Sequence, residues 1–223
     1  MSHLFANIGR YIDLLPILLF VFLILKQKKK ANKGLWVIFF YCLFVAINDN
    51  ILFRLIPDDY SKYIFSTYTL LEFLVFTFFL WLNTENKYFR LLLMITSCLF
   101  SLFISIYFLS VEFDFIDSIP IGVETILVIG FSVYFLYEQV NKSSDLLYNT
   151  PEFWVISGFL IYLAGSFFIY IYANHVPVSE LKKFWFVTFI FGILKNIFIS
   201  VAYLVSIKQP KIQHPTKYQP FLN

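Results

Sequence analysis

The stretch Phe184–Ile207 constrains the fold most, because it is almost wholly apolar yet carries Lys195 and Asn196 near its middle. At ~1.5 Å per residue, a helix of this length crosses the ~30 Å hydrocarbon core of a bilayer. A lysine at that depth costs roughly 2.5–3.5 kcal/mol even on the gentlest insertion scale, so it needs a partner or a function. Helical spacing predicts that the lysine faces a bundle interior instead of lipid. The same helical face also carries Thr188, Gly192 and Ser200.

The composition indicates an all-α polytopic membrane protein. The chain is 60% hydrophobic and 14% charged, with a mean hydropathy of +0.76, a balance that soluble domains do not have. The apolar stretches are too long for strands and lack a period of two, so they predict membrane-crossing helices. These stretches are Leu4–Leu25, Leu35–Leu55, Tyr63–Leu82, Phe89–Val111, Ile119–Tyr137, Phe153–Ala173 and Phe184–Ile207. We therefore expect a seven-helix transmembrane bundle over residues 1–207 and a short basic cytoplasmic tail over residues 208–223.

Basic residues predict the orientation of this bundle in the membrane. Eleven lysines and arginines fall in the loops and tail on one side, with the densest group between Lys26 and Lys33. Five fall on the opposite side. The positive-inside rule therefore places the N-terminus outside and the C-terminus in the cytoplasm. A multi-pass protein of a bacterial inner (cytoplasmic) membrane is the localisation that we expect.

Carboxylic acids inside the predicted spans indicate where a ligand or ion would bind. Asp49 ends the outer third of the second stretch, Glu72 lies midway through the third, and Glu124 follows Pro120 by one turn in the fifth. With the orientation above, these acids lie between the outer surface and the centre, and the inner halves of the helices carry none. This asymmetry predicts an outward-facing polar pocket. Its predicted residues are Asp49, Tyr68, Glu72, Glu124, Tyr162, Lys195 and Asn196.

Structural interpretations of the same charges stay open. Glu72 and Lys195 are predicted at one depth, so they can form an ion pair whose only role is to hold two helices together. Asp49 can form hydrogen bonds locally near the end of its helix. Asp13 lies three residues after Arg10 near the outer end of the first stretch, which favours an interfacial ion pair between them.

Small residues predict where helices pack closely. Ser97, Ser101 and Ser105 recur every four residues in the fourth stretch, and Gly158 and Gly165 are seven residues apart on one face of the sixth. Such seams let neighbouring helices approach each other. The two cysteines, Cys42 and Cys98, fall inside predicted spans, so we expect free, buried thiols and no disulfide.

Motifs typical of enzymes do not occur in the sequence. The histidines are His3, His175 and His214, and no HExxH, CxxC, GxSxG or glycine-rich phosphate loop is present. We therefore expect neither an enzyme nor a metal or other cofactor. The lysines cluster beside apolar segments, which argues against a nucleic-acid partner.

Three short motifs resemble those of a family of small seven-helix membrane proteins from Bacteroidetes-type bacteria. Tyr68–Phe73 reads YTLLEF and resembles the family's YTLxEF motif, and Lys195–Ile197 resembles its KNI. The segment from Phe153 to Tyr162 resembles its FWxxSGxLxY pattern. Members are often encoded beside sensor histidine kinases, so the resemblance implies an association with signalling. The positions of interest that it implies are Glu72, Ser157, Tyr162, Lys195 and Asn196.

The sequence as a whole predicts a receptor-like signalling protein. A small ligand in the polar pocket would alter helix packing, and a sensor kinase or other membrane protein would respond. The alternative is a proton- or cation-coupled carrier or channel that uses Asp49, Glu72, Glu124 and Lys195. A minor alternative is a retinal-binding protein with a Schiff base at Lys195 and Glu72 as counter-ion.

Overall fold

The computed structural model describes residues 2–27, 32–48, 61–110, 118–142, 146–172, 180 and 183–208. These residues are almost entirely helical, which confirms the predicted all-α class. The helices are α1 (Ser2–Gln27), α2 (Lys33–Ile47), α4 (Ser61–Asn83), α5 (Lys87–Ser110), α6 (Ser118–Lys142), α7 (Pro151–Tyr172) and α9 (Phe186–Lys208), with a short 3-10 helix η3 (Leu147–Asn149) before α7. Each α-helix covers most of one predicted apolar stretch.

Five of the described helices are long and apolar enough to cross a membrane, namely α4, α5, α6, α7 and α9. The apolar part of α1 is shorter, at Tyr11–Leu25, and so is α2 at Lys33–Ile47. The predicted second stretch continues to Leu55, and its residues after Asn48, including Asp49, lie outside the described residues. Pro16 does not end α1, because helices in apolar surroundings tolerate the loss of one backbone hydrogen bond.

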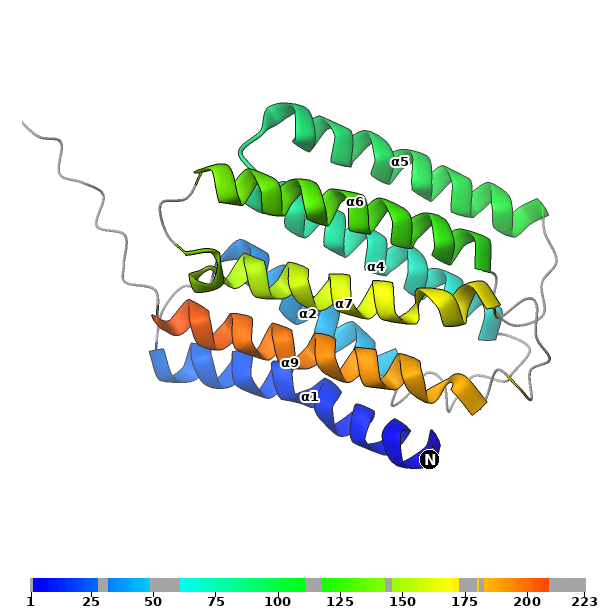
Figure 1. The fold of residues 1–223 in the computed structure, drawn as a ribbon, viewed down its shortest axis with the longest axis horizontal. Coiled ribbons are helices and arrows are strands. Elements are labelled where there is room, and N and C mark those ends of the chain that lie inside the picture. Colours follow the sequence, from blue (N-terminus) through cyan, green and yellow to red (C-terminus); the bar gives the residue numbers. More distant parts are fainter. Residues whose placement is uncertain are drawn as a thin grey trace, which may run out of the picture.

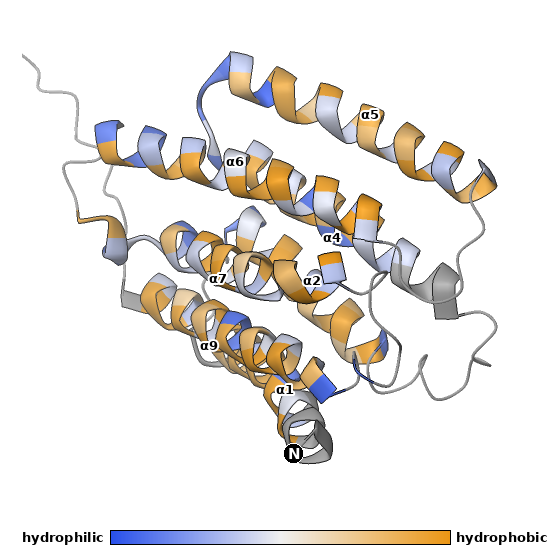
Figure 2. Ribbon diagram, turned by 45° about the vertical axis from the view of Figure 1, so that its right-hand side comes forward, coloured by the Kyte–Doolittle hydropathy of each residue, from blue (hydrophilic) through white to orange (hydrophobic). Residues whose placement is uncertain are grey.

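The helices run along one long axis and form a ring with α5 outside it (Figure 1). Around the ring, α1 packs on α2, α2 on α4, α4 on α6, α6 on α7, α7 on α9, and α9 returns to α1. Helix α5 packs chiefly on α4 and lies at the edge of the bundle, where its surface is predominantly apolar (Figure 2). Aromatic residues fill the ring interior. Fully buried examples are Phe20, Phe76, Phe159 and Tyr203, while buried Phe73 packs against Phe100 of α5.

The glycines of α7 form its seam with α9, as the sequence predicts. A Cβ on Gly158 would lie 2.9 Å from the Cβ of Phe198 and 3.2 Å from the carbonyl oxygen of Lys195. A Cβ on Gly165 would lie 2.3 Å from the ring of Phe191. Because neither glycine has a side chain, the backbone of α7 approaches the middle of α9 closely, and this contact fixes the height of Lys195.

The serines of α5 are less uniform than predicted. Ser97 faces α4, and its hydroxyl donates to Oγ1 of Thr77 at 3.1 Å. Ser105 is exposed and donates to the Ser101 carbonyl of its own helix. The expectation of two buried thiols holds for Cys42 and is wrong for Cys98, because α5 lies outside the ring and exposes that face. Both cysteines are free.

Candidate functional site

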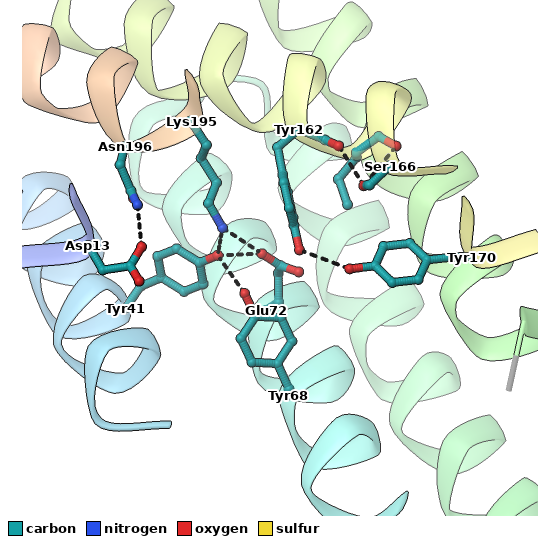
Figure 3. A network of polar contacts seen from close by, with 10 residues as sticks. Asp13, Tyr41, Tyr68, Glu72, Tyr162, Ser166, Tyr170, Lys195 and Asn196 are labelled. Atoms are coloured by element: carbon teal, nitrogen blue, oxygen red, sulfur yellow. Dashed lines mark hydrogen bonds and ion pairs between the residues drawn. The ribbon is translucent and has the colours of Figure 1, made fainter. Parts of the chain in front are cut away.

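Lys195 forms the centre of a buried polar network inside the ring (Figure 3). Its ammonium Nζ lies 3.4 Å from Oε1 of Glu72, and the two side chains are only 3% and 4% exposed. The Lys195 ammonium also donates a hydrogen bond to the hydroxyl of Tyr41, which in turn donates to Oε1 of Glu72. Tyr41 therefore bridges the ion pair, so that α2, α4 and α9 meet at one point. The Tyr68 hydroxyl lies 3.4 Å from that of Tyr41 and extends the network along α4.

Aromatic rings surround the rest of the Lys195 ammonium. Nζ lies 3.9 Å from the ring centroid of Tyr162, 4.8 Å from that of Tyr41 and 5.5 Å from that of Phe159. Each distance is within the range of a cation–π contact, which gains strength away from water. Because Tyr162 and Phe159 belong to α7, the lysine contacts that helix too. Ionic, hydrogen-bonding and cation–π contacts thus offset the desolvation of one charge.

Two further contacts connect this centre with its surroundings. The side-chain amide of Asn196 donates to Oδ1 of Asp13 at 2.6 Å, which ties α9 to α1. The hydroxyl groups of Tyr162 and Tyr170 lie 3.4 Å apart along α7 (Figure 3). The structure therefore gives Asp13 a partner on α9, while the side chain of Arg10, its predicted partner, lies outside the described residues.

Glu124 on α6 is a second carboxyl group beside the ion pair. Its side chain is 2% exposed and interacts electrostatically with both Glu72 and Lys195. Oε1 of Glu124 has no hydrogen-bond partner among the described residues, and neither does Nδ2 of Asn48. Two carboxyl groups thus face one ammonium in a buried site. A second positive charge or a proton is required to balance them.

The opposite end of α6 carries an acid that contradicts one sequence expectation. Glu138 is buried in the half of α6 that was expected to lack acids, because the helix continues past Tyr137 to Lys142. Oε2 of Glu138 accepts a hydrogen bond from the Thr84 hydroxyl at 2.5 Å, and Oε1 accepts one from the backbone N–H of Glu85 at 3.3 Å. This carboxyl group therefore holds the turn between α4 and α5.

The structure brings together most of the predicted pocket. Tyr68, Glu72, Tyr162 and Lys195 lie in one network, Asn196 adjoins it, and Glu124 interacts with its charges. Asp49 lies outside the described residues. Ser157 is half-buried on α7, beside Gly158. Of the serines predicted to pack between helices, Ser97 contacts α4, whereas Ser105 is exposed.

Tyr41 is the residue that sequence reasoning missed. Its sequence neighbours give a weak signal, because Tyr41, Val45 and Asn48 share one face of α2 and all are buried. Tyr41 lies two helical turns before Asn48 on that face, so the buried asparagine indicates a polar surface that the tyrosine shares. The chain contains 15 tyrosines, however, so a single tyrosine in a span is not distinctive.

The chemistry of this site is that of charge and proton exchange. A lysine, two carboxyl groups and several tyrosine hydroxyls can bind an anionic or cationic group, or redistribute protons among themselves. Within the described residues, no group of three or more His, Cys, Asp or Glu side chains is arranged to hold a metal ion.

Comparisons with known proteins found no relative of this chain. No family description, curated protein or solved structure matches this chain.

Proposed function

We propose that this protein is a receptor-like membrane component in which the state of the Lys195 network controls the packing of the helices. The observation that carries the proposal is the shared ammonium: Lys195 on α9 contacts Tyr41 of α2, Glu72 of α4 and Tyr162 of α7. A ligand or proton that engages Glu72 or Lys195 has to replace one of these contacts. Because the contacts join four helices, replacing one shifts the preferred arrangement of all of them.

The proposal includes seven crossings, with the N-terminus outside and the C-terminus in the cytoplasm of a bacterial inner membrane. Five helices of sufficient length support a membrane location, and the distribution of lysines supports the orientation. Asp13 lies near the middle of α1, opposite Asn196, whereas Glu124 lies toward the outer end of α6 in this orientation. A small polar ligand would therefore reach the network from outside. The partner that responds is proposed to be a sensor kinase or another membrane protein, in line with the sequence resemblance.

A second candidate function is a proton- or cation-coupled carrier. The free oxygen of Glu124 beside Glu72 and Lys195 favours it, because a carrier needs a carboxyl group that can gain and lose a cation. Buried Glu138 adds an acid toward the other end. Between these acids, however, Phe76 lies on α4 and Phe135 on α6, and both rings are fully buried. The buried hydroxyls in this region, of Thr77 and Ser132, donate to carbonyls of their own helices. Few free polar groups are thus available for a continuous polar path, so the receptor is favoured.

Two measurements, one on purified protein and one in cells, separate the candidates. Purified protein in liposomes with an internal pH dye should show no more proton entry than empty liposomes under an imposed potential. Proton entry that Glu124→Gln abolishes would establish the carrier and overturn the receptor. In the bacterium that encodes the chain, deletion should change the phosphorylation of a response regulator. Wild-type protein should restore that phosphorylation, and Lys195→Met at the same membrane abundance should not.

A further inference from the structure

A groove on the outside of the bundle lies between α4 and α5, away from the Lys195 network. Its volume is about 580 Å3 and its surface is almost wholly apolar. Leu74, Phe78 and Trp81 of α4 form one wall, and Leu93, Met94 and Cys98 of α5 form the other. Since both helices are long and apolar enough to span a membrane, the groove opens toward the bilayer.

Polar atoms in the floor of the groove are already satisfied. The hydroxyl of Ser97 donates to Oγ1 of Thr77 at 3.1 Å, and the Thr77 hydroxyl donates to the Phe73 carbonyl at 2.8 Å. An occupant of this part of the groove therefore gains nothing from hydrogen-bonding groups. It needs apolar surface that follows the two helices, as a hydrocarbon chain provides.

A cationic side chain lies at one end of the same groove. Arg90 precedes Leu93 and Met94 by one turn on α5, so it shares their helical face. Its guanidinium carbon lies 5.4 Å from the ring centroid of Trp81. Nε of Arg90 is buried and has no hydrogen-bond partner, and no ion pair to this guanidinium occurs among the described residues. Lys87, one turn earlier, is exposed.

The depth of Arg90 matches that of a lipid headgroup. Helix α4 ends at Asn83 and α5 begins at Lys87, so Arg90 is about 5 Å inside the end of the helix. At that depth an arginine extends its guanidinium to the membrane surface. The first backbone N–H groups of α5 already have a partner, because Oδ1 of Asn86 accepts from Tyr88 at 2.9 Å and from Phe89 at 3.4 Å. An anion at this point would therefore bind the side chains and not the helix end.

We propose that the groove between α4 and α5 binds one anionic phospholipid, with an acyl chain along the apolar walls and the phosphate beside Arg90 and Lys87. The guanidinium of Arg90, stacked on Trp81, and the apolar groove that runs from it match the two parts of such a lipid. Basic pockets between membrane helices are a known mode of binding anionic headgroups. The two cationic side chains favour an anionic lipid, because a zwitterionic lipid can carry the same acyl chains but its headgroup has no net charge.

Native mass spectrometry on the full chain in detergent tests this lipid site. Titration with phosphatidylglycerol and with phosphatidylcholine of the same acyl chains gives two dissociation constants. We expect phosphatidylglycerol to bind about 25-fold more tightly, because Arg90 and Lys87 should each contribute about 5-fold near an anionic lipid. Arg90→Gln should reduce this preference to about 5-fold, Arg90→Gln together with Lys87→Gln should reduce it to about 1-fold, and Arg90→Lys should keep most of it. Lys33→Gln, an exposed lysine outside the groove at the same end of the bundle, should leave the preference unchanged.

A second pair of variants tests the acyl-chain part of the site. Cys98→Trp fills the groove and should weaken binding of both lipids, whereas Leu99→Trp, on an exposed face of α5 outside the groove, should not. Equal affinities of wild-type protein for the two lipids would overturn the proposal, as would a full preference that survives when both Arg90 and Lys87 are replaced by glutamine. A dimer without bound lipid would show that a second copy of the chain covers the groove and would equally overturn it.

Discussion

The backbone of Lys195 lies directly against Gly158, with its carbonyl oxygen 3.2 Å from the position that a Cβ on Gly158 would occupy. This contact sets the height at which the lysine side chain enters the ring. The same contact lies in the most extensively packed helix pair, α7 and α9. Lys195 is the buried cation of the ring interior among the described residues. The packing of α7 on α9 and the geometry of the polar network are therefore one structural feature.

Replacing Gly158 by alanine should destabilise the protein. The new methyl group would meet the Cβ of Phe198 at 2.9 Å, and overpacking of this kind costs about 1–3 kcal/mol. Thermal unfolding in detergent measures the effect. Gly122→Ala on α6 is the matched control, because a Cβ there meets nothing within 4 Å, so its melting temperature should stay equal or rise. Equal melting temperatures for Gly158→Ala and wild type would show that α7 and α9 are less tightly packed than described.

Replacing Tyr41 by phenylalanine should weaken the network while leaving its shape intact. The hydroxyl accepts from Lys195 and donates to Glu72, so its removal leaves two buried charged groups with fewer partners. A cost of about 1–3 kcal/mol follows. Tyr137→Phe removes a hydroxyl from an exposed position on α6 and should cost close to nothing. If both variants unfold at the wild-type denaturant concentration, the bridging role of Tyr41 is refuted.

The proposed orientation makes a prediction about two exposed lysines at opposite ends of the bundle. Lys33 begins α2, and Lys183 lies just before α9. On a background without native cysteines, Lys183→Cys should react with a membrane-impermeant maleimide in intact cells, and Lys33→Cys only after lysis. The reverse pattern would invert the topology and place the approach to the network on the cytoplasmic side.

The retinal alternative predicts a visible absorption band, and we expect none. The Lys195 ammonium already contacts Glu72 and Tyr41, and the ring of Tyr162 lies 3.9 Å from it, where a polyene would have to extend. All-trans retinal added to purified protein should therefore give only the spectrum of free retinal. A band that hydroxylamine bleaches and Lys195→Ala prevents would instead identify the site as a chromophore pocket.

Charged residues made the centre of the site predictable from sequence, whereas uncharged ones did not. Lys195 and Glu72 are unusual in long apolar stretches, helical spacing assigned Lys195 to an inward face, and their equal predicted depth allowed an ion pair between them. Tyr41 carries no such signal, because tyrosine is frequent in this chain and occurs on lipid-facing as well as inward surfaces. Glu138 was not predicted as a buried acid because the predicted apolar stretch ends at Tyr137, whereas α6 continues to Lys142.

The sequence also did not predict that α5 lies outside the ring. Side chains that face lipid are as apolar as those that face the bundle interior, so hydropathy does not distinguish a ring helix from a peripheral one. Leu93 on α5 is buried, while Leu99 on the same helix is 59% exposed. Only the arrangement of the other helices reveals the difference.

A double-mutant cycle on Glu72 and Lys195 tests the central claim most directly. Glu72→Gln and Lys195→Met each leave one buried charge without its partner, and each should cost roughly 3–5 kcal/mol of unfolding free energy in detergent. The double variant removes both charges, so it should recover much of that loss and show a large coupling energy. If the two single effects simply add in the double variant, the ion pair does not hold the helices together and the account of the network is wrong.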